Sequence, residues 1–235
     1  MNLVELVLLF IMAFLPPLIY TIWIRNIEKI NREKWIPIFF CFLWGSTIAI
    51  VAAVIIELIL HISIVPSVED PTSMGFIAVV FIAPFAEEFT KPLALRLKIV
   101  RKELDELEDG LIYGAVAGLG FSATENLLYG WDFLSEGLLF FFIFISIRSF
   151  GGCLLHASAT AWTGFGYGKT IIKNTKLIQV LPYFLLAIFV HAFYNALLSF
   201  EFLGAIIGLS AALIFTAITI TIVKNKIVNL DNISR

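Results

Sequence analysis

Charged residues are scarce in this chain of 235 residues, and their scarcity excludes an ordinary water-soluble fold. Lys, Arg, Asp and Glu together make up 14% of the sequence, whereas hydrophobic residues make up 60%. Water-soluble domains contain about 25% charged and about 45–50% apolar residues. A soluble fold of this length would lack the polar side chains to cover its surface, so lipid is the solvent for most of the chain.

Other absences narrow the class further. The only two cysteines, Cys41 and Cys153, lie in apolar segments and are expected to be packing residues rather than a disulfide. The N-terminus lacks the basic region and the cleavage site of a secretory signal, which predicts a retained first helix. Without repeats or linkers, residues 1–235 are expected to form one transmembrane domain. The net charge of −2 gives no sign of a nucleic-acid partner, and none is expected.

Long apolar runs predict an all-α, multi-pass bundle. A span needs about 20 mostly apolar residues to cross about 30 Å of hydrocarbon. About seven segments satisfy this, namely 3–24, 36–62, 73–95, 110–130, 138–168, 177–199 and 202–223. The Gly151-Gly152 pair in the fifth segment is a place where that helix could bend.

The distribution of positive charge predicts the orientation. Of the 16 Lys and Arg residues, 14 lie in alternate connections and in the tail, at 25–35, 96–109, 169–176 and 224–235. The other connections contain none. Short cytoplasmic loops attract Lys and Arg, so the N-terminus is expected outside and the C-terminus in the cytoplasm of a cell-membrane protein.

Ionisable side chains are unexpectedly frequent inside four consecutive spans. Such groups cost several kcal/mol at bilayer depth, roughly, and usually face a protein interior or a water-filled cavity. The set comprises Glu87, Glu88 and Lys91, then Glu125, then Arg148 and His156, then His191 together with the polar but uncharged Asn195. Any one of them has a structural explanation, such as an ion pair or a hydrogen bond between helices. The complete set is hard to explain by packing.

Helical spacing groups these residues. Lys91 shares a helix face with Glu87 (i,i+4) and Glu88 (i,i+3), so it can pair with one glutamate and leave the other for chemistry. His191 and Asn195 share a face in the same way. Gly110, Gly114, Gly118 and Ser122 form a face of small residues, which favours close helix packing and turns Glu125 into the bundle.

Hydrolysis of a peptide bond needs an activated water and stabilisation of an oxyanion. A buried glutamate near a cation can serve as the base, and His191 and Asn195 can donate to the oxyanion. Alternatively, Glu125, His156 and His191 can hold zinc, with Glu87 or Glu88 as the base. There is no His-Glu-x-x-His, no nucleophile-elbow serine and no pair of intramembrane aspartates, which disfavours serine-type and aspartyl-type proteolysis.

Four motifs resemble those of a known family. Glu87-Glu88-x-x-Lys91, Phe121-x-x-x-Glu125, His156-x7-Gly164 and His191-x-x-x-Asn195 are similar to the PrsW family, which is related to CAAX-processing and bacteriocin-processing membrane proteases. The resemblance covers about residues 73 to 200. Lys91 and Glu125 stand where the prenyl-protease branch has arginine and histidine, which places the chain nearer to PrsW.

The resemblance implies an intramembrane endopeptidase with Glu87, Glu88, Glu125, His156 and His191 at its centre and Asn195 assisting. It implies a membrane-anchored substrate like the anti-sigma factors that PrsW-type proteases cut first. It leaves the need for metal open, because related enzymes depend on glutamate. The alternatives are a proton-coupled transporter or channel and a non-catalytic scaffold, although the inverted repeats typical of many transporters are not evident.

One feature of the predicted site does not fit straight, level helices. At about 1.5 Å per residue, Glu87 would lie about 10 Å from the cytoplasmic edge, and Glu125 and His191 about 20 Å. A tilt, a kink at Pro84 or Gly151, or shifted boundaries must close this gap if the residues form one site.

Overall fold

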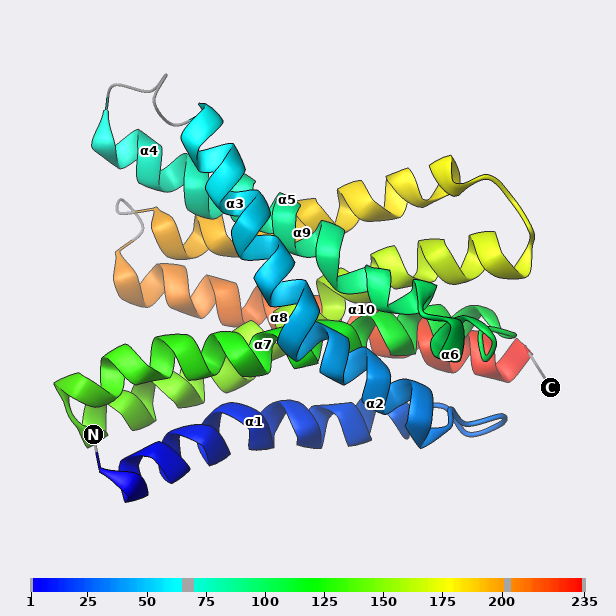
Figure 1. Ribbon diagram of the computed structural model, residues 1–235, viewed down its shortest axis with the longest axis horizontal. Helices are drawn as coiled ribbons and strands as arrows, with labels where there is room; N and C mark the ends of the chain where they lie inside the picture. The colour runs from blue at the N-terminus through cyan, green and yellow to red at the C-terminus, as the bar shows by residue number, and fades with distance from the viewer. Residues whose placement is uncertain (1, 65–69, 201–203, 234–235) are drawn as a thin grey trace.

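The computed structural model describes residues 2–64, 70–200 and 204–233, and within them every regular element is helical (Figure 1). The all-α prediction is therefore confirmed. The α-helices are α1 (Leu3–Arg25), α2 (Trp35–Trp44), α3 (Ile50–Ile64), α4 (Pro71–Ile77), α5 (Ala83–Thr90), α6 (Lys98–Arg101), α7 (Leu107–Glu136), α8 (Leu138–Ile172), α9 (Leu181–Ser199) and α10 (Ala205–Ile233).

Short π and 3₁₀ turns join some of these helices into longer rods. The π-helical turn η1 (Gly45–Ala49) connects α2 to α3, and η3 (Ala78–Ile82) connects α4 to α5. The 3₁₀ turn η4 (Lys91–Arg96) extends α5, and η5 (Leu177–Val180) precedes α9. Helix α8 runs without interruption through the Gly151-Gly152 pair.

Within the described residues, six helical stretches are long and apolar enough to cross a membrane: Leu3–Arg25, Trp35–Ile64, Pro71–Arg96, Leu138–Ile172, Leu177–Ser199 and Ala205–Ile233. They correspond to six of the predicted spans. Residues 202 and 203 of the last predicted span, and Arg235 of the basic tail, lie outside the described residues. The remaining predicted span lies within α7, which has 30 residues but is not one of the six. The count of seven and the orientation stay predictions.

Helices α7 and α8 form the centre of the bundle. They are antiparallel neighbours joined at Gly137; α1 packs on α7, and α9 and α10 pack on α8 (Figure 1). The rod of α2 and α3 crosses the other helices at a steep angle. Helix α1 begins and α10 ends at opposite ends of the molecule, as the predicted orientation requires.

The face of small residues on α7 allows its close contact with α8. A Cβ atom on Gly110 would lie 2.5 Å from the carbonyl oxygen of Gly164, and one on Gly118 would lie 2.3 Å from that of His156. Both distances are too short for a side chain, so the backbones touch only because these residues are glycines. Gly118 thereby sets the distance between α7 and the turn of α8 that carries His156.

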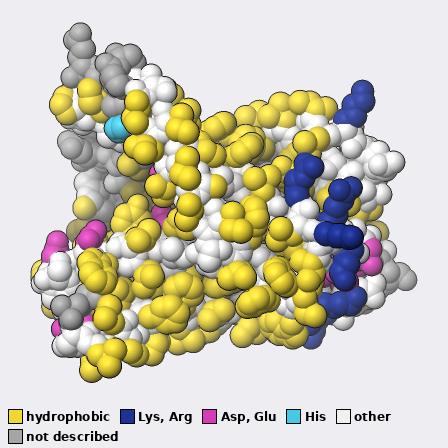
Figure 2. Space-filling model, viewed as in Figure 1, with side chains coloured by type: hydrophobic (Ala, Val, Ile, Leu, Met, Phe, Trp, Pro, Cys, Tyr) yellow, Lys and Arg dark blue, Asp and Glu magenta, His cyan; other side chains and the backbone are white. Residues whose placement is uncertain are grey.

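The molecular surface has the character expected of a membrane protein. Hydrophobic side chains cover most of the visible flank, and Lys and Arg gather at one end (Figure 2). Leu3, Phe39 and Ile206 are 76%, 59% and 82% exposed. An apolar surface of this extent is stable only in lipid or against a partner, which agrees with several helices long and apolar enough to cross a membrane.

Candidate active site

Lys91 lies at the centre of the predicted cluster and is fully buried. Its Nζ donates to Glu87 Oε2 at 2.7 Å and to Glu88 Oε1 at 2.9 Å, as the helical spacing predicts. It also lies 2.8 Å from Nδ1 of His156 on α8 and 4.3 Å from the ring centroid of Phe121 on α7. One ammonium group therefore connects the glutamate pair to two other helices.

The partners of His156 define its tautomer. A protonated lysine only donates, so Nδ1 of His156 accepts from Lys91 and the ring proton is on Nε2. Nε2 lies 2.6 Å from Glu125 Oε2, which accepts that proton's hydrogen bond. Arg148 holds Glu125 from the other side, with Nη2 at 2.9 Å from the carboxylate and Nε at 2.9 Å from Asn126 Oδ1. Arg148 thereby ties Glu125 and Asn126 of α7 to α8.

Glu88 and His191 form a second hydrogen-bonded pair. Nδ1 of His191 lies 3.0 Å from Glu88 Oε1, and the hydroxyl of Thr160 donates to Glu88 Oε2 at 2.8 Å. With Lys91, three groups hold this carboxylate, which is 0% exposed. His191 also meets the ring of His156 edge-on, with centroids 4.9 Å apart. Glu88 is thus a fixed residue that orients His191.

Glu87 is the glutamate that reaches open space. It is 6% exposed and lines a cavity of about 340 Å³ together with Glu125, Arg148, His156, His191 and Asn195. A second, more apolar cavity of about 280 Å³ touches the centre at Glu88 and is lined by Phe89, Tyr167 and Phe184. The polar centre therefore lies between two cavities, and Glu87 faces the larger one.

Asn195 takes a different position from the rest of the predicted set. Its side-chain amide donates to the backbone carbonyl of Val79 at 2.8 Å, so it joins α9 to the π-helical turn η3 between α4 and α5. It lines the larger cavity without a hydrogen bond to Glu87, Glu88 or Lys91 in the described part of the chain. The other seven residues of the set are brought together.

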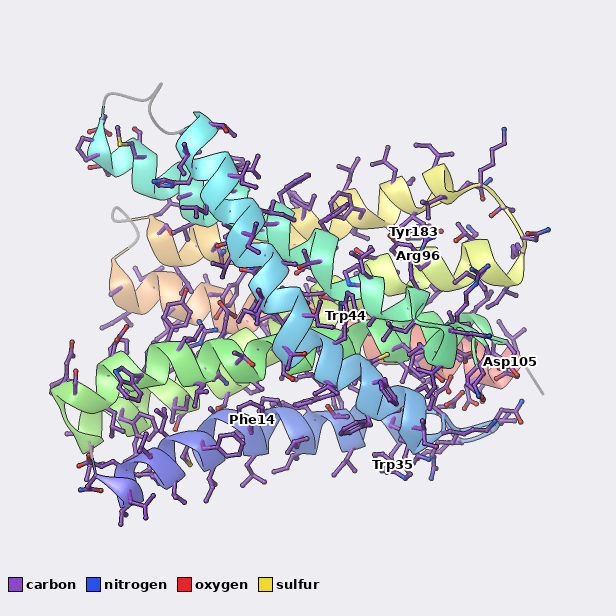
Figure 3. All side chains as sticks on the ribbon, in the orientation of Figure 1. Phe14, Trp35, Trp44, Arg96, Asp105 and Tyr183 are labelled. Atoms are coloured by element: carbon purple, nitrogen blue, oxygen red, sulfur yellow. The ribbon has the colours of Figure 1, made fainter. Side chains whose placement is uncertain are left out.

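The expected difference in membrane depth between Glu87 and the pair Glu125 and His191 disappears. The helical segment from α4 to η4, which carries Glu87, does not end level with its neighbours. Arg96, its last residue, lies nearer the middle of the molecule than Asp105, just before α7 (Figure 3). Residues 97–106, including α6, cover the remaining distance. Trp44 anchors the rod at this level, since its Nε1 donates to the Thr90 carbonyl at 3.1 Å.

The donor set fits a metal ion in its chemistry. Glu87, Glu88, His156 and His191 are all buried, and one ligand atom from each lies within 4.8 Å of the others. Two imidazoles with carboxylates are ligands that zinc prefers. Lys91 now forms hydrogen bonds with three of these four residues, so a bound ion would compete with the ammonium for them. Glu125 is outside the four-residue group and stands behind His156, where carboxylates often orient metal-binding imidazoles.

Thr160, which donates to Glu88, was not among the predicted site residues. Its position was detectable, because Thr160 is four residues after His156 and shares its helix face. The pairing of Glu125 with His156 was not detectable, since it depends on how α7 and α8 are rotated against each other.

These features define a class. A carboxylate that faces a cavity, set beside a buried cation and two imidazoles among membrane-spanning helices, makes the chain a membrane-embedded hydrolase rather than a passive bundle. The family model described as PrsW family intramembrane metalloprotease matches residues 33–223. The chain belongs to this family, and it is an intramembrane protease whose substrates are membrane proteins.

Curated relatives agree with the family. The chain is 25% identical over 200 residues to Protease PrsW of Clostridioides difficile (strain 630), covering 85% of this chain and 82% of the relative. It is 28% identical over 189 residues to Protease PrsW of Oceanobacillus iheyensis, covering 78% and 79%. It is 31% identical over 133 residues to Protease PrsW of Geobacillus kaustophilus, covering 56% and 54%. No solved structure was found to match the chain.

Proposed function

We propose that Glu87 is the general base that activates water for cleavage of a membrane-anchored protein. The observation that carries this assignment is the unequal environment of the two adjacent glutamates. Glu88 is held by Lys91, Thr160 and His191 and has no exposed surface. Glu87 faces the larger cavity, where a water and a peptide carbonyl can approach its carboxylate.

The other residues have supporting roles. Lys91 compensates the charge of the glutamate pair and fixes the position of Glu87. Glu125 sets the tautomer of His156, and Glu88 sets the orientation of His191. His191 lines the same cavity as Glu87, and Asn195 lies one helical turn further along, so both are placed to donate to the oxyanion if Asn195 releases Val79.

The metal that the family description implies is proposed to be zinc, with His156, His191 and Glu88 as its ligands. This set replaces Glu125 of the sequence-based prediction with Glu88, because Glu125 stands behind His156. When bound, zinc would lower the pKa of a water molecule and polarise the scissile carbonyl. Glu87 would remain the base in that case.

The position of the larger cavity favours one side of the membrane for cleavage. Its lining residues Val79, Tyr129 and Leu198 lie on the parts of their helices that the predicted orientation places beyond the centre, toward the outside. We propose that the substrate is a single-pass protein similar to an anti-sigma factor, cut in the outer half of its span or next to it.

Two measurements test whether zinc is bound and required. One is elemental analysis of the purified protein, and the other is the effect of a chelator on cleavage of a single-pass model substrate. About one zinc per chain and cleavage that is lost with chelator and restored by zinc support the proposed ligands. Full cleavage by zinc-free protein would contradict a need for zinc, and Lys91 would then be the positive charge that the site uses.

Mass spectrometry of the two products identifies the peptide bond at which the substrate is cut. A cut in the outer half of the substrate span supports entry through the larger cavity. A cut near the cytoplasmic end would contradict it and point to the apolar cavity beside Glu88.

A further inference from the structure

A second group of acids, most of them buried, lies at the end of the molecule that is predicted to be cytoplasmic. Glu28 and Glu33 come from the connection between α1 and α2, and Glu106, Glu108 and Asp109 come from the start of α7. One carboxylate oxygen each from Glu28, Glu33 and Asp109 lie within 4.8 Å of one another, and the same holds for Glu28, Glu106 and Glu108. Glu28 belongs to both groups and is 0% exposed.

Two oxygens in this cluster are buried without a hydrogen-bond partner among the described residues: Oε1 of Glu28 and Oε2 of Glu106. The second oxygen of each side chain is engaged. Glu28 Oε2 accepts from the backbone N–H of Glu33 at 2.9 Å, and Glu106 Oε1 accepts from the amide of Asn31 at 2.8 Å. Burying a carboxylate oxygen without a partner costs free energy. A bound ligand at each of these oxygens would remove that cost.

The nearby arginines direct hydrogen bonds to the backbone carbonyls of Glu28 and Glu33 rather than to their carboxylates. Arg25 donates through Nε to the backbone carbonyl of Glu33 at 2.6 Å and stacks over Trp35, and Arg32 donates to the carbonyl of Glu28 at 3.1 Å. Among the described residues, neither Lys nor Arg forms an ion pair with Glu28, Glu33 or Asp109.

Burial and neighbouring acids raise pKa values in the cluster. Burial raises the pKa of Glu28 to about 8, and the acidic neighbours Asp109, Glu108 and Glu106 act in the same direction. Burial and the nearby Asp109 also raise the pKa of Glu33. Its carboxylate accepts from the hydroxyl of Tyr113.

The backbone around the cluster is already organised. Asp109 accepts from the N–H groups of Asp105 and Glu106 at 2.8 and 2.7 Å, which fixes the first turn of α7. Asp231 near the end of α10 accepts from the N–H groups of Lys29 and Ile30 at 3.1 and 3.0 Å. Three segments far apart in the sequence therefore meet here and hold the carboxylates close together.

We propose that this cluster is a structural site for a hard divalent cation of the Mg²⁺, Ca²⁺ or Mn²⁺ class, with Glu28 as the central ligand. The donors are all oxygens, which suits these ions, whereas the histidine-containing centre deeper in the bundle suits zinc. The bound ion would link the connection between α1 and α2 to the start of α7. The proposal does not depend on the proteolytic mechanism.

Thermal unfolding of the full chain in detergent tests this site. Chelator-treated protein is compared with and without millimolar Ca²⁺, Mg²⁺ or Mn²⁺. At least one ion should raise the unfolding temperature by about 5 °C or more at saturation. Glu28→Gln should abolish the rise, whereas Glu103→Gln should retain it, because Glu103 is close in sequence to Glu106 but pairs with the exposed Lys34 and belongs to neither group of acids.

Glu106→Gln provides a second variant if Glu28→Gln does not fold, since Glu106 is only partly buried. It should weaken binding of Mn²⁺, measured by electron paramagnetic resonance, by about tenfold or more. An unchanged response in both acid variants, or no response in the parent protein, would overturn the proposal. The carboxyl groups would then share protons instead of a metal ion.

Discussion

Nε2 of His156 lies 2.6 Å from the carboxylate of Glu125, and the opposite ring nitrogen lies 2.8 Å from Lys91. The first contact leaves the lone pair of Nδ1 directed at the centre of the site. A histidine held in this way is ready to bind a cation there, whether an ammonium group or a metal ion.

Changing Glu125 to Gln should impair the site without unfolding the protein. The amide keeps the size of the side chain but lacks the charge that holds His156 and Arg148. Cleavage should fall by about 10–100-fold, together with affinity for any bound metal. Initial rates on a single-pass substrate measure the effect. A rate equal to that of the parent would show that the charge of Glu125 does not contribute to cleavage.

Replacing Thr160 by Val should also slow cleavage, since it removes the hydroxyl that donates to Glu88 at 2.8 Å. A hydrogen bond to a charged group contributes about 1.5–3 kcal/mol, which corresponds to a fall in rate of about tenfold or more if it is lost in the transition state. Thr160→Ser retains the donor and should restore most of the rate. Equal rates for the Val and Ser variants would show that the hydroxyl has no part.

Lys91→Ala should lower both stability and activity. It leaves the buried carboxylates of Glu87 and Glu88 without their shared cation, and breaking a buried pair costs about 3–5 kcal/mol. Thermal unfolding in detergent measures the loss. The double variant with Glu88→Gln should be more stable than Lys91→Ala alone. If it is less stable, charge repulsion is not the cause.

Much of the fold was predictable because the hydrophobic runs are long and their ends are marked by charge. The boundaries were less predictable where polar residues continue a helix. Helix α10 extends to Ile233, ten residues past the predicted end at 223, and α7 extends to Glu136 rather than 130. Residues 131–136 of α7 and 224–233 of α10 continue their helices. Their polar side chains interrupt the apolar run, so the hydrophobic pattern ends before the helix does.

Which residues come together around Lys91 was also predictable, since ionisable residues are normally rare in membrane spans and therefore conspicuous here. The roles of these residues were not. Helical spacing placed Lys91 beside Glu87 and Glu88, but only the packing of α5 against α8 shows that His156 approaches the same ammonium. The cluster around Glu28 was missed because its members look like ordinary loop charges and are about 80 residues apart, as between Glu33 and Tyr113.

Gly118→Ala tests whether close contact between α7 and α8 supports catalysis. The added Cβ would lie 2.3 Å from the His156 carbonyl and must push the helices apart. We expect a loss of stability of about 1–3 kcal/mol and a fall in cleavage beyond the unfolded fraction. Gly75→Ala is the matched control, because a Cβ there meets nothing within 4 Å. Comparable effects of both substitutions would contradict a specific role for this contact.

The central claim is that Glu87 activates the water. Single-turnover cleavage of a membrane-anchored substrate by Glu87→Gln protein, with unfolding temperature and metal content measured on the same sample, tests it most directly. The exposed Glu136→Gln serves as the control. We predict a fall of at least about 10²-fold in the Glu87 variant, with its fold retained and the control unaffected. Cleavage by a folded Glu87→Gln protein at the rate of the parent would contradict the account.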